Sequence, residues 1–227
     1  DAAARTLVDA YARAEAAGLA VAKAESATLL LKITGERQAR DADATLWARL
    51  AAAVLEHLGW PVEARVDYLA ALGAVHTRFG RQVEAIAALD EALALETGLP
   101  VVRPNQALFH RLRGNALFRL GKLKEAQAEY ERSVALAGQS FGPEHPEVAR
   151  TINNLGEVLR VAGELDPAEA NFRRAATITE RAFGAEHPAL APPLSGLATI
   201  AYGRGDLDTA AREFRRIAAL FERTPGP

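Results

Sequence analysis

The sequence predicts an all-α protein, a right-handed α-α superhelical solenoid of about five helix pairs behind one leading helix. The first observation is composition: 227 residues include 50 alanines but only 17 glycines and 11 prolines, which favours helix over nearly the whole chain. The second is an internal repeat with a period of about 42 residues, in the range of known helical arrays. The third is that apolar residues within each repeat recur at helical spacing. Stacked helix pairs explain all three observations.

The repeat is clearest in a six-residue motif that precedes a helix. Phe141–Pro146 reads Phe-Gly-Pro-Glu-His-Pro, and Phe183–Pro188 repeats it with a single change, alanine for Pro143. The glycines expected to end the first helix of each unit recur at almost the same interval: Gly80, Gly121, Gly163 and Gly205. Such a regular period is typical of arrays in which each unit buries its apolar face against the next.

Small and large residues alternate in a way that two packed helices require. A small residue precedes a large one by four positions in each second helix: Ala85 and Leu89, Ala126 and Tyr130, Ala168 and Phe172, Ala210 and Phe214. Another small residue lies twelve positions before each of these alanines: Gly73, Gly114, Gly156 and Ala198. Helix axes approach closely only where side chains are small. We therefore expect these positions to face one another.

The pattern predicts eleven helices along the chain. They are expected over 3–17, 19–34, 37–58, 61–79, 82–97, 104–120, 122–138, 145–162, 166–183, 190–203 and 206–222. Prolines stand at several starts, where the missing N–H costs nothing. Asp166, Pro167 and Glu169 read as a capping box, whereas Pro192 and Pro193 should shorten or kink their helix.

We treat residues 1–227 as one domain, although the repeat varies in clarity along it. The repeat is clear over 104–222, weaker over 61–100 and degenerate over 1–60, where the interval from Gly35 to Gly80 is longer than those between the later glycines. The absence of Met, even at position 1, suggests a piece of a longer protein.

The repeat resembles the tetratricopeptide repeat, whose unit is shorter, at about 34 residues. With Glu144-His145-Pro146 before the helix and Asn153–Gly156 inside it, it is similar to the longer kinesin-light-chain variety. Arrays that resemble this variety often occur in bacterial signalling proteins, for example as C-terminal regions of Ser/Thr kinases. The resemblance implies a cytoplasmic protein-binding scaffold within a larger bacterial signalling or regulatory protein. His110 and Arg113 depart from the family's apolar pattern.

Composition and motifs argue against several other classes of protein. The 27 basic and 29 acidic residues give a net charge of -2, so we expect no nucleic-acid partner. No apolar run approaches the length of about 20 residues that spans a membrane, and the chain has no cysteine. It also lacks phosphate-binding glycine loops and nucleophile motifs. We therefore predict no enzyme activity, cofactor or metal.

His145 and His187 occupy the same place in successive repeats, which allows either a ligand role or a structural one. Adjacent repeats stack about 10 Å apart, too far for both imidazoles to bind one zinc ion at about 2 Å. The alternative is that Glu-His-Pro closes the loop between repeats and satisfies free backbone groups at the helix start. We predict the structural role.

The candidate binding site is the concave wall formed by the first helices. Helical geometry and the resemblance together give the groove residues Arg111, Asn115, Phe118, Arg150, Asn153, Asn154, Glu157, Arg160 and Tyr202. In the family, inner-wall asparagines hold the backbone of an extended peptide and basic residues take its acidic side chains. The resemblance therefore implies a partially acidic peptide as the ligand, although Ser195–Gly196 replaces the asparagine pair in the last repeat.

A second function stays open, that of a structural element which self-associates or packs on its parent protein. Phe118 and Tyr202 in the groove favour peptide binding. Ile217, Leu220 and Phe221 on the final helix favour assembly, because the last helix of such an array usually has a polar outer face. We expect Leu220 and Phe221 to be exposed.

Overall fold

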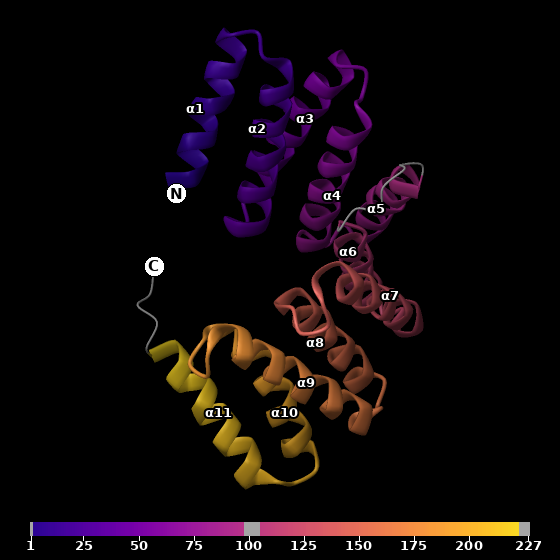
Figure 1. Cartoon of the computed structure of the whole chain (residues 1–227), viewed down its shortest axis with the longest axis vertical. Helices are drawn as coiled ribbons and strands as arrows, with labels where there is room; N and C mark the ends of the chain where they lie inside the picture. The colour runs from indigo at the N-terminus through magenta and orange to yellow at the C-terminus, as the bar shows by residue number, and fades with distance from the viewer. Residues whose placement is uncertain (1, 98–104, 223–227) are drawn as a thin grey trace. The chain divides into compact units, whose positions relative to one another are not determined.

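The computed structural model describes residues 2–97 and 105–222 (Figure 1). Its helices are α1 (Ala2–Ala16), α2 (Ala20–Lys32), α3 (Asp41–His57), α4 (Val62–Arg78), α5 (Gln82–Thr97), α6 (Asn105–Arg119), α7 (Leu123–Phe141), α8 (Pro146–Val161), α9 (Leu165–Phe183), α10 (Ala191–Gly203) and α11 (Leu207–Glu222). Each predicted helix is confirmed within a few residues at either end. The predicted start of the sixth helix, residue 104, lies outside the described part of the chain. An all-α fold of sequential helix pairs is therefore established.

The chain divides into two compact units, residues 1–120 and 121–227, and we describe each by itself. Within the first unit α1 packs on α2, α2 on α3, α4 on α5, and α5 on α6. Its core is a continuous apolar cluster that includes Leu31, Leu55, Val66, Leu89 and Phe109, each at most 1 % exposed. The single domain expected over 1–227 stays a prediction.

One helix of the first unit begins later than expected. The helix predicted over 37–58 starts at Asp41, because α2 continues into a short π-helical segment, Ile33–Arg37. Within that segment the Thr34 hydroxyl donates a hydrogen bond of 2.7 Å to the carbonyl oxygen of Leu30. The wider turn thus takes up Arg37, and residues 38–40 connect it to α3.

The second unit contains α7 to α11, with each helix packed on the next (Figure 1). The small residue of each repeat lies in the core as predicted: Ala126 and Ala168 are fully buried and Ala210 is 3 % exposed. Gly163 and Gly205 have φ angles of +85° and +81°, and this left-handed conformation directly after a helix favours glycine. The repeated alanines therefore mark where helices pack closely, and the repeated glycines mark where helices end.

The six-residue motif closes the loop before a first helix, and the structural role of its histidines is confirmed. The Nδ1 atom of His145 accepts a hydrogen bond of 3.2 Å from the backbone N–H of Glu147, and its ring stacks on Phe141 with centroids 4.8 Å apart. His187 accepts from Ala189 at 3.2 Å and stacks on Phe183 at 4.6 Å. Both imidazoles are N-caps, and each packs against the motif's own phenylalanine.

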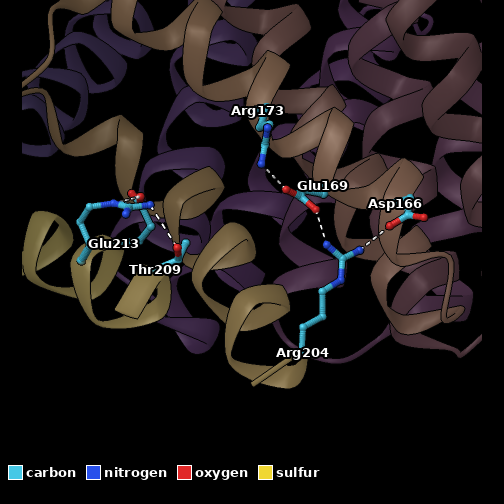
Figure 2. A network of polar contacts seen from close by, with 7 residues as sticks. Asp166, Glu169, Arg173, Arg204, Thr209 and Glu213 are labelled. Carbon is cyan, nitrogen blue, oxygen red and sulfur yellow. Dashed lines mark hydrogen bonds and ion pairs between the residues drawn. The ribbon is translucent and has the colours of Figure 1, made fainter. Parts of the chain in front are cut away.

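The capping box predicted at Asp166 is wrong. Helix α9 already begins at Leu165, and its N-cap, Glu164, makes no side-chain cap bond. The carboxylates of Asp166 and Glu169 instead bind the guanidinium of Arg204, which lies in the loop between α10 and α11 (Figure 2). Because the helix starts before Asp166, this residue already lies inside the first turn and is not the N-cap, and both carboxylates are engaged by Arg204.

The paired prolines shorten their helix, as predicted. Pro188–Leu190 forms a 3-10 turn, and α10 starts only at Ala191, so that Pro192 and Pro193 lie in its first turn. Residues there need no intrahelical N–H bond. Helix α10 has 13 residues, against 16 for the equivalent α8.

Candidate peptide-binding surface

In the second unit, the candidate residues lie on the side of α8 that faces away from the core. Helix α8 buries Val148, Ile152 and Leu159. The remaining arc carries Arg150, which is exposed, and four half-buried residues, Asn153, Asn154, Glu157 and Arg160. Five predicted groove residues therefore share one helix surface.

Helix α10 contacts α8 and extends this surface. Its exposed positions are Ser195, Thr199 and Tyr202, and the Tyr202 side chain is 66 % exposed. The hydroxyl of Thr199 donates to the carbonyl oxygen of Ser195 at 2.8 Å. We call the outward residues Arg150, Asn153, Asn154, Glu157, Arg160, Ser195, Thr199 and Tyr202 the α8/α10 surface.

The arginines of this surface are paired with acidic residues of their own helix. Arg150 forms an ion pair with Glu147, three residues earlier. Arg160 binds Glu157 through two nitrogens, with its Nε donating to Oε2 at 2.9 Å, and this bonding raises the pKa of the Arg160 guanidinium. The expected basic stripe is therefore balanced by carboxylates. Glu147 was missed, although its spacing of three residues from Arg150 is that of a helical ion pair.

Asn153 carries the least satisfied polar atom of the α8/α10 surface. Its Oδ1 is buried, and no described residue donates a hydrogen bond to it. Buried polar atoms in native proteins almost always have a partner. Because this oxygen has no contact with solvent, a bound ligand satisfies it only when the Asn153 carboxamide turns outward.

The three remaining candidates belong to the first unit, on α6. Arg111 is buried, at 9 % exposed, and its place on the binding wall stays a prediction. Phe118 and Asn115 are half-buried. Helix α6 also buries Ala107 and Phe109. Within the second unit, the structure brings together the candidates of α8 and α10.

Two searches of the described part of the chain bear on other functions. Residues 2–97 and 105–222 contain no group of three or more His, Asp or Glu side chains placed to hold a metal ion. Across the same residues, no helix has both the length and the apolar character needed to cross a bilayer.

Comparison with known proteins identifies the repeat. The model of the tetratricopeptide repeat matches residues 106–178 and 149–223, more than half of the chain. The chain belongs to the tetratricopeptide repeat family. Its repeat unit is thus a long form of this repeat. No match was found among the curated proteins.

Solved structures share the fold at low sequence identity. BtubC (BKLC) from P. vanneervenii is 19% identical with a TM-score of 0.77, and the match covers 100% of this chain and 92% of that one. A putative kinesin light chain of Podospora anserina with nearly identical TPR-like repeats is 18% identical, with a TM-score of 0.69 over 89% and 97% of the two chains. A Rap protein in complex with Competence and Sporulation Factor is 18% identical, with a TM-score of 0.72 over 87% of this chain and 56% of that one. These likenesses establish kinesin-light-chain-like architecture and nothing finer.

Proposed function

We propose that the chain is a protein-interaction module of a larger signalling or regulatory protein, and that its α8/α10 surface binds an extended, partially acidic peptide. The observation that carries this proposal is the buried Oδ1 of Asn153, which has no hydrogen-bond donor in the described structure. A backbone N–H of an extended peptide is a donor of the required kind. The Rap protein, which shares the fold, was crystallised with a peptide factor, and this supports the same class of ligand.

Tyr202 supplies the apolar part of the proposed contact. Its side chain is 66 % exposed on α10, the helix that packs beside α8. Tyrosine offers a large, rigid surface that loses little conformational entropy on binding. A peptide held at Asn153 would therefore gain both a hydrogen bond and a ring to pack against.

The two arginines differ in what they offer an acidic side chain. The side chain of Arg150 is 51 % exposed and makes a contact with Glu147 through one nitrogen, whereas Arg160 is 29 % exposed and is held by Glu157 through two. An incoming carboxylate has to displace the existing partner, and a single exposed contact is exchanged at lower cost. We therefore assign the acidic residue of the peptide to Arg150.

A peptide library displayed against the full chain tests this function, since it supplies extended peptides of every charge. Selected peptides should be enriched in acidic residues. Binding of a selected peptide, measured by fluorescence anisotropy, should weaken about fivefold or more in Asn153→Ala, because a peptide N–H is left unpaired. Asn153→Ser keeps an acceptor oxygen without adding a negative charge that would repel an acidic peptide, and it should retain more affinity.

Two further variants separate the roles and control for stability. Arg150→Glu should abolish the preference for acidic peptides and reverse the salt dependence of association. Asn171→Ala, on α9, removes an amide that donates to the carbonyl oxygen of Pro167 and should leave binding unchanged. Failure to select any peptide, or selected peptides that bind Asn153→Ala at full strength, would overturn the proposal.

A further inference from the structure

The last helix, α11, exposes a regular apolar stripe. Leu207, Phe214 and Phe221 are 61%, 48% and 56% exposed, at intervals of seven residues. Ala211 and Ala218 lie between them, half-buried and exposed respectively. The five residues follow one another at spacings of 4, 3, 4 and 3, which places them on one side of the helix. We call them the α11 stripe.

The equivalent side of the internal second helices is covered. Phe214 corresponds to Tyr130 of α7 and Phe172 of α9, which are 2% and 1% exposed. Phe172 lies against Gly196 of the following helix, α10. The α11 stripe thus corresponds to the surface with which an internal second helix packs against the next repeat. No described helix covers it on α11.

The stripe nevertheless differs from an ordinary repeat joint. At the position of Phe221 the internal helices carry the small residues Ala137 and Thr179, both buried, because the next helix passes close by there. At the position of Ala211, α9 carries Glu169, whose carboxylate binds Arg204. A further helix of the internal type would collide with Phe221. The stripe is therefore both larger and more apolar than the surface another regular repeat requires.

We propose that the α11 stripe binds a second copy of this chain, with the two α11 helices packed antiparallel about a two-fold axis. Large and small residues alternate along the stripe, so an antiparallel partner can place each phenylalanine or leucine over an alanine. In one register Ala211 meets Phe214 of the second copy, and Leu207 meets its Ala218. Two-fold pairing repeats each contact, as an interface between identical surfaces must.

Charge favours the same register. Asp208 and Arg215 flank the stripe on one side, and among the described residues neither forms an ion pair or a side-chain hydrogen bond. In an antiparallel pair, residues on one flank meet residues of the same flank. When Ala211 meets Phe214 of the second copy, Asp208 therefore comes beside Arg215 of that copy, and the reverse contact forms as well. Size and charge thus select one arrangement.

Sedimentation equilibrium of the full chain tests the pairing. The measured mass should rise from that of one chain to that of two between about 1 µM and about 500 µM, the range expected for a small helix pair. Phe214→Asp should remove the dimer over this range, because it places a carboxylate at the centre of the stripe. Val161→Asp is the matched control: Val161 is also 48% exposed but lies at the end of α8, and its substitution should leave the dimer intact. Far-ultraviolet circular dichroism confirms that each variant is folded.

A charge exchange tests the orientation. Asp208→Arg and Arg215→Asp should each weaken the dimer about tenfold, because each places like charges together at two sites. The double variant, which exchanges the two charges, should restore the dissociation constant of the natural chain. Recovery is specific to the proposed register.

Three outcomes would overturn the inference. A chain that sediments as a monomer at every concentration has its stripe covered in another way or not at all. A dimer that survives Phe214→Asp uses another surface, and loss without recovery in the charge-exchanged variant rejects the antiparallel register. The proposal is independent of peptide binding, because the α11 stripe contains no residue of the α8/α10 surface.

Discussion

Phe172 of α9 lies so close to Gly196 of α10 that a Cβ atom added to the glycine would come within 2.5 Å of the Cζ atom of the ring. On the neighbouring helix, an added Cβ at Gly156 of α8 would come within 2.9 Å of the same ring. The phenylalanine is 1% exposed. It fits between two helices because each of them lacks a side chain where the ring passes. In the second unit, α8, α9 and α10 thus pack around one aromatic ring that lies between two glycines.

Gly196→Ala should destabilise the second unit. The methyl group would overlap the ring of Phe172, which also lies close to Gly156 of α8, and overpacking of this kind costs about 1–3 kcal/mol. Gly203→Ala is the matched control on the same helix, since an added Cβ there meets nothing within 4 Å. It should be neutral or stabilising, because alanine favours helix. Urea unfolding compares the two, and equal midpoints would contradict the close approach.

Ala168→Leu should overpack the joint from the other side. Ala168 is fully buried beside Phe172 and Ile200, and three added carbons there should cost about 1–3 kcal/mol. Ala170, two positions later, is exposed, so Ala170→Leu should change the free energy of unfolding by less than about 0.5 kcal/mol. Thermal melts of both variants check the helical phase of α9; similar losses would show that it is wrong.

His145→Ala should loosen the start of α8. The substitution removes the acceptor of the Glu147 N–H and the ring that stacks on Phe141, and loss of an N-cap costs about 1 kcal/mol. His145→Asn restores a capping oxygen without the aromatic ring, so it should recover part of the stability. Hydrogen exchange of the Glu147 amide measures the cap directly. Unchanged protection in His145→Ala would contradict the capping role.

The repeat could be predicted because close helix packing fixes the size of the residue at each position of the repeat. Packing requires Ala126, Ala168 and Ala210 to be small, and glycine is favoured at positive φ after a helix, so both features recur at the period of the fold. Gly196 was not identified as a contact, because the repeat places Ala198 at that joint and Gly196 stands where the preceding repeat has Asn154. Contact between the ring of Phe172 and a glycine of the next helix becomes visible only when the helices are packed.

The candidate site was harder to predict, because its surface charge depends on which oppositely charged residue each side chain binds. Arg150 and Arg160 were expected to face a ligand, yet both bind carboxylates of α8. Asp166 and Glu169 were expected to cap a helix, yet Arg204 takes both. Leu220 was expected to be exposed with Phe221, but it is 4% exposed and packs against Leu190 and Leu194. Helical phase fixes a face to within about one residue, and neighbouring positions at its edge can differ completely in burial.

The pairing of Glu169 with Arg204 should make the stability of the second unit depend on pH (Figure 2). The hydrogen bond from Arg204, followed by the charges of Arg173 and Arg204, lowers the pKa of Glu169 below its ordinary value of 4.5. A carboxyl group whose pKa is lower in the folded state stabilises the fold above its unfolded pKa, and that contribution is lost as the pH falls through the folded value.

Comparing variants isolates this carboxylate from the many others that titrate in acid. The natural chain should unfold at a higher urea concentration than Glu169→Gln at about pH 7, and the two midpoints should converge as the pH falls below about 4. Arg204→Gln removes the main cause of the lowered pKa, so in that background Glu169→Gln should have a much smaller effect at neutral pH. A difference between the natural chain and Glu169→Gln that stays constant from neutral to acid pH would show that the carboxylate contributes through packing and not through its charge.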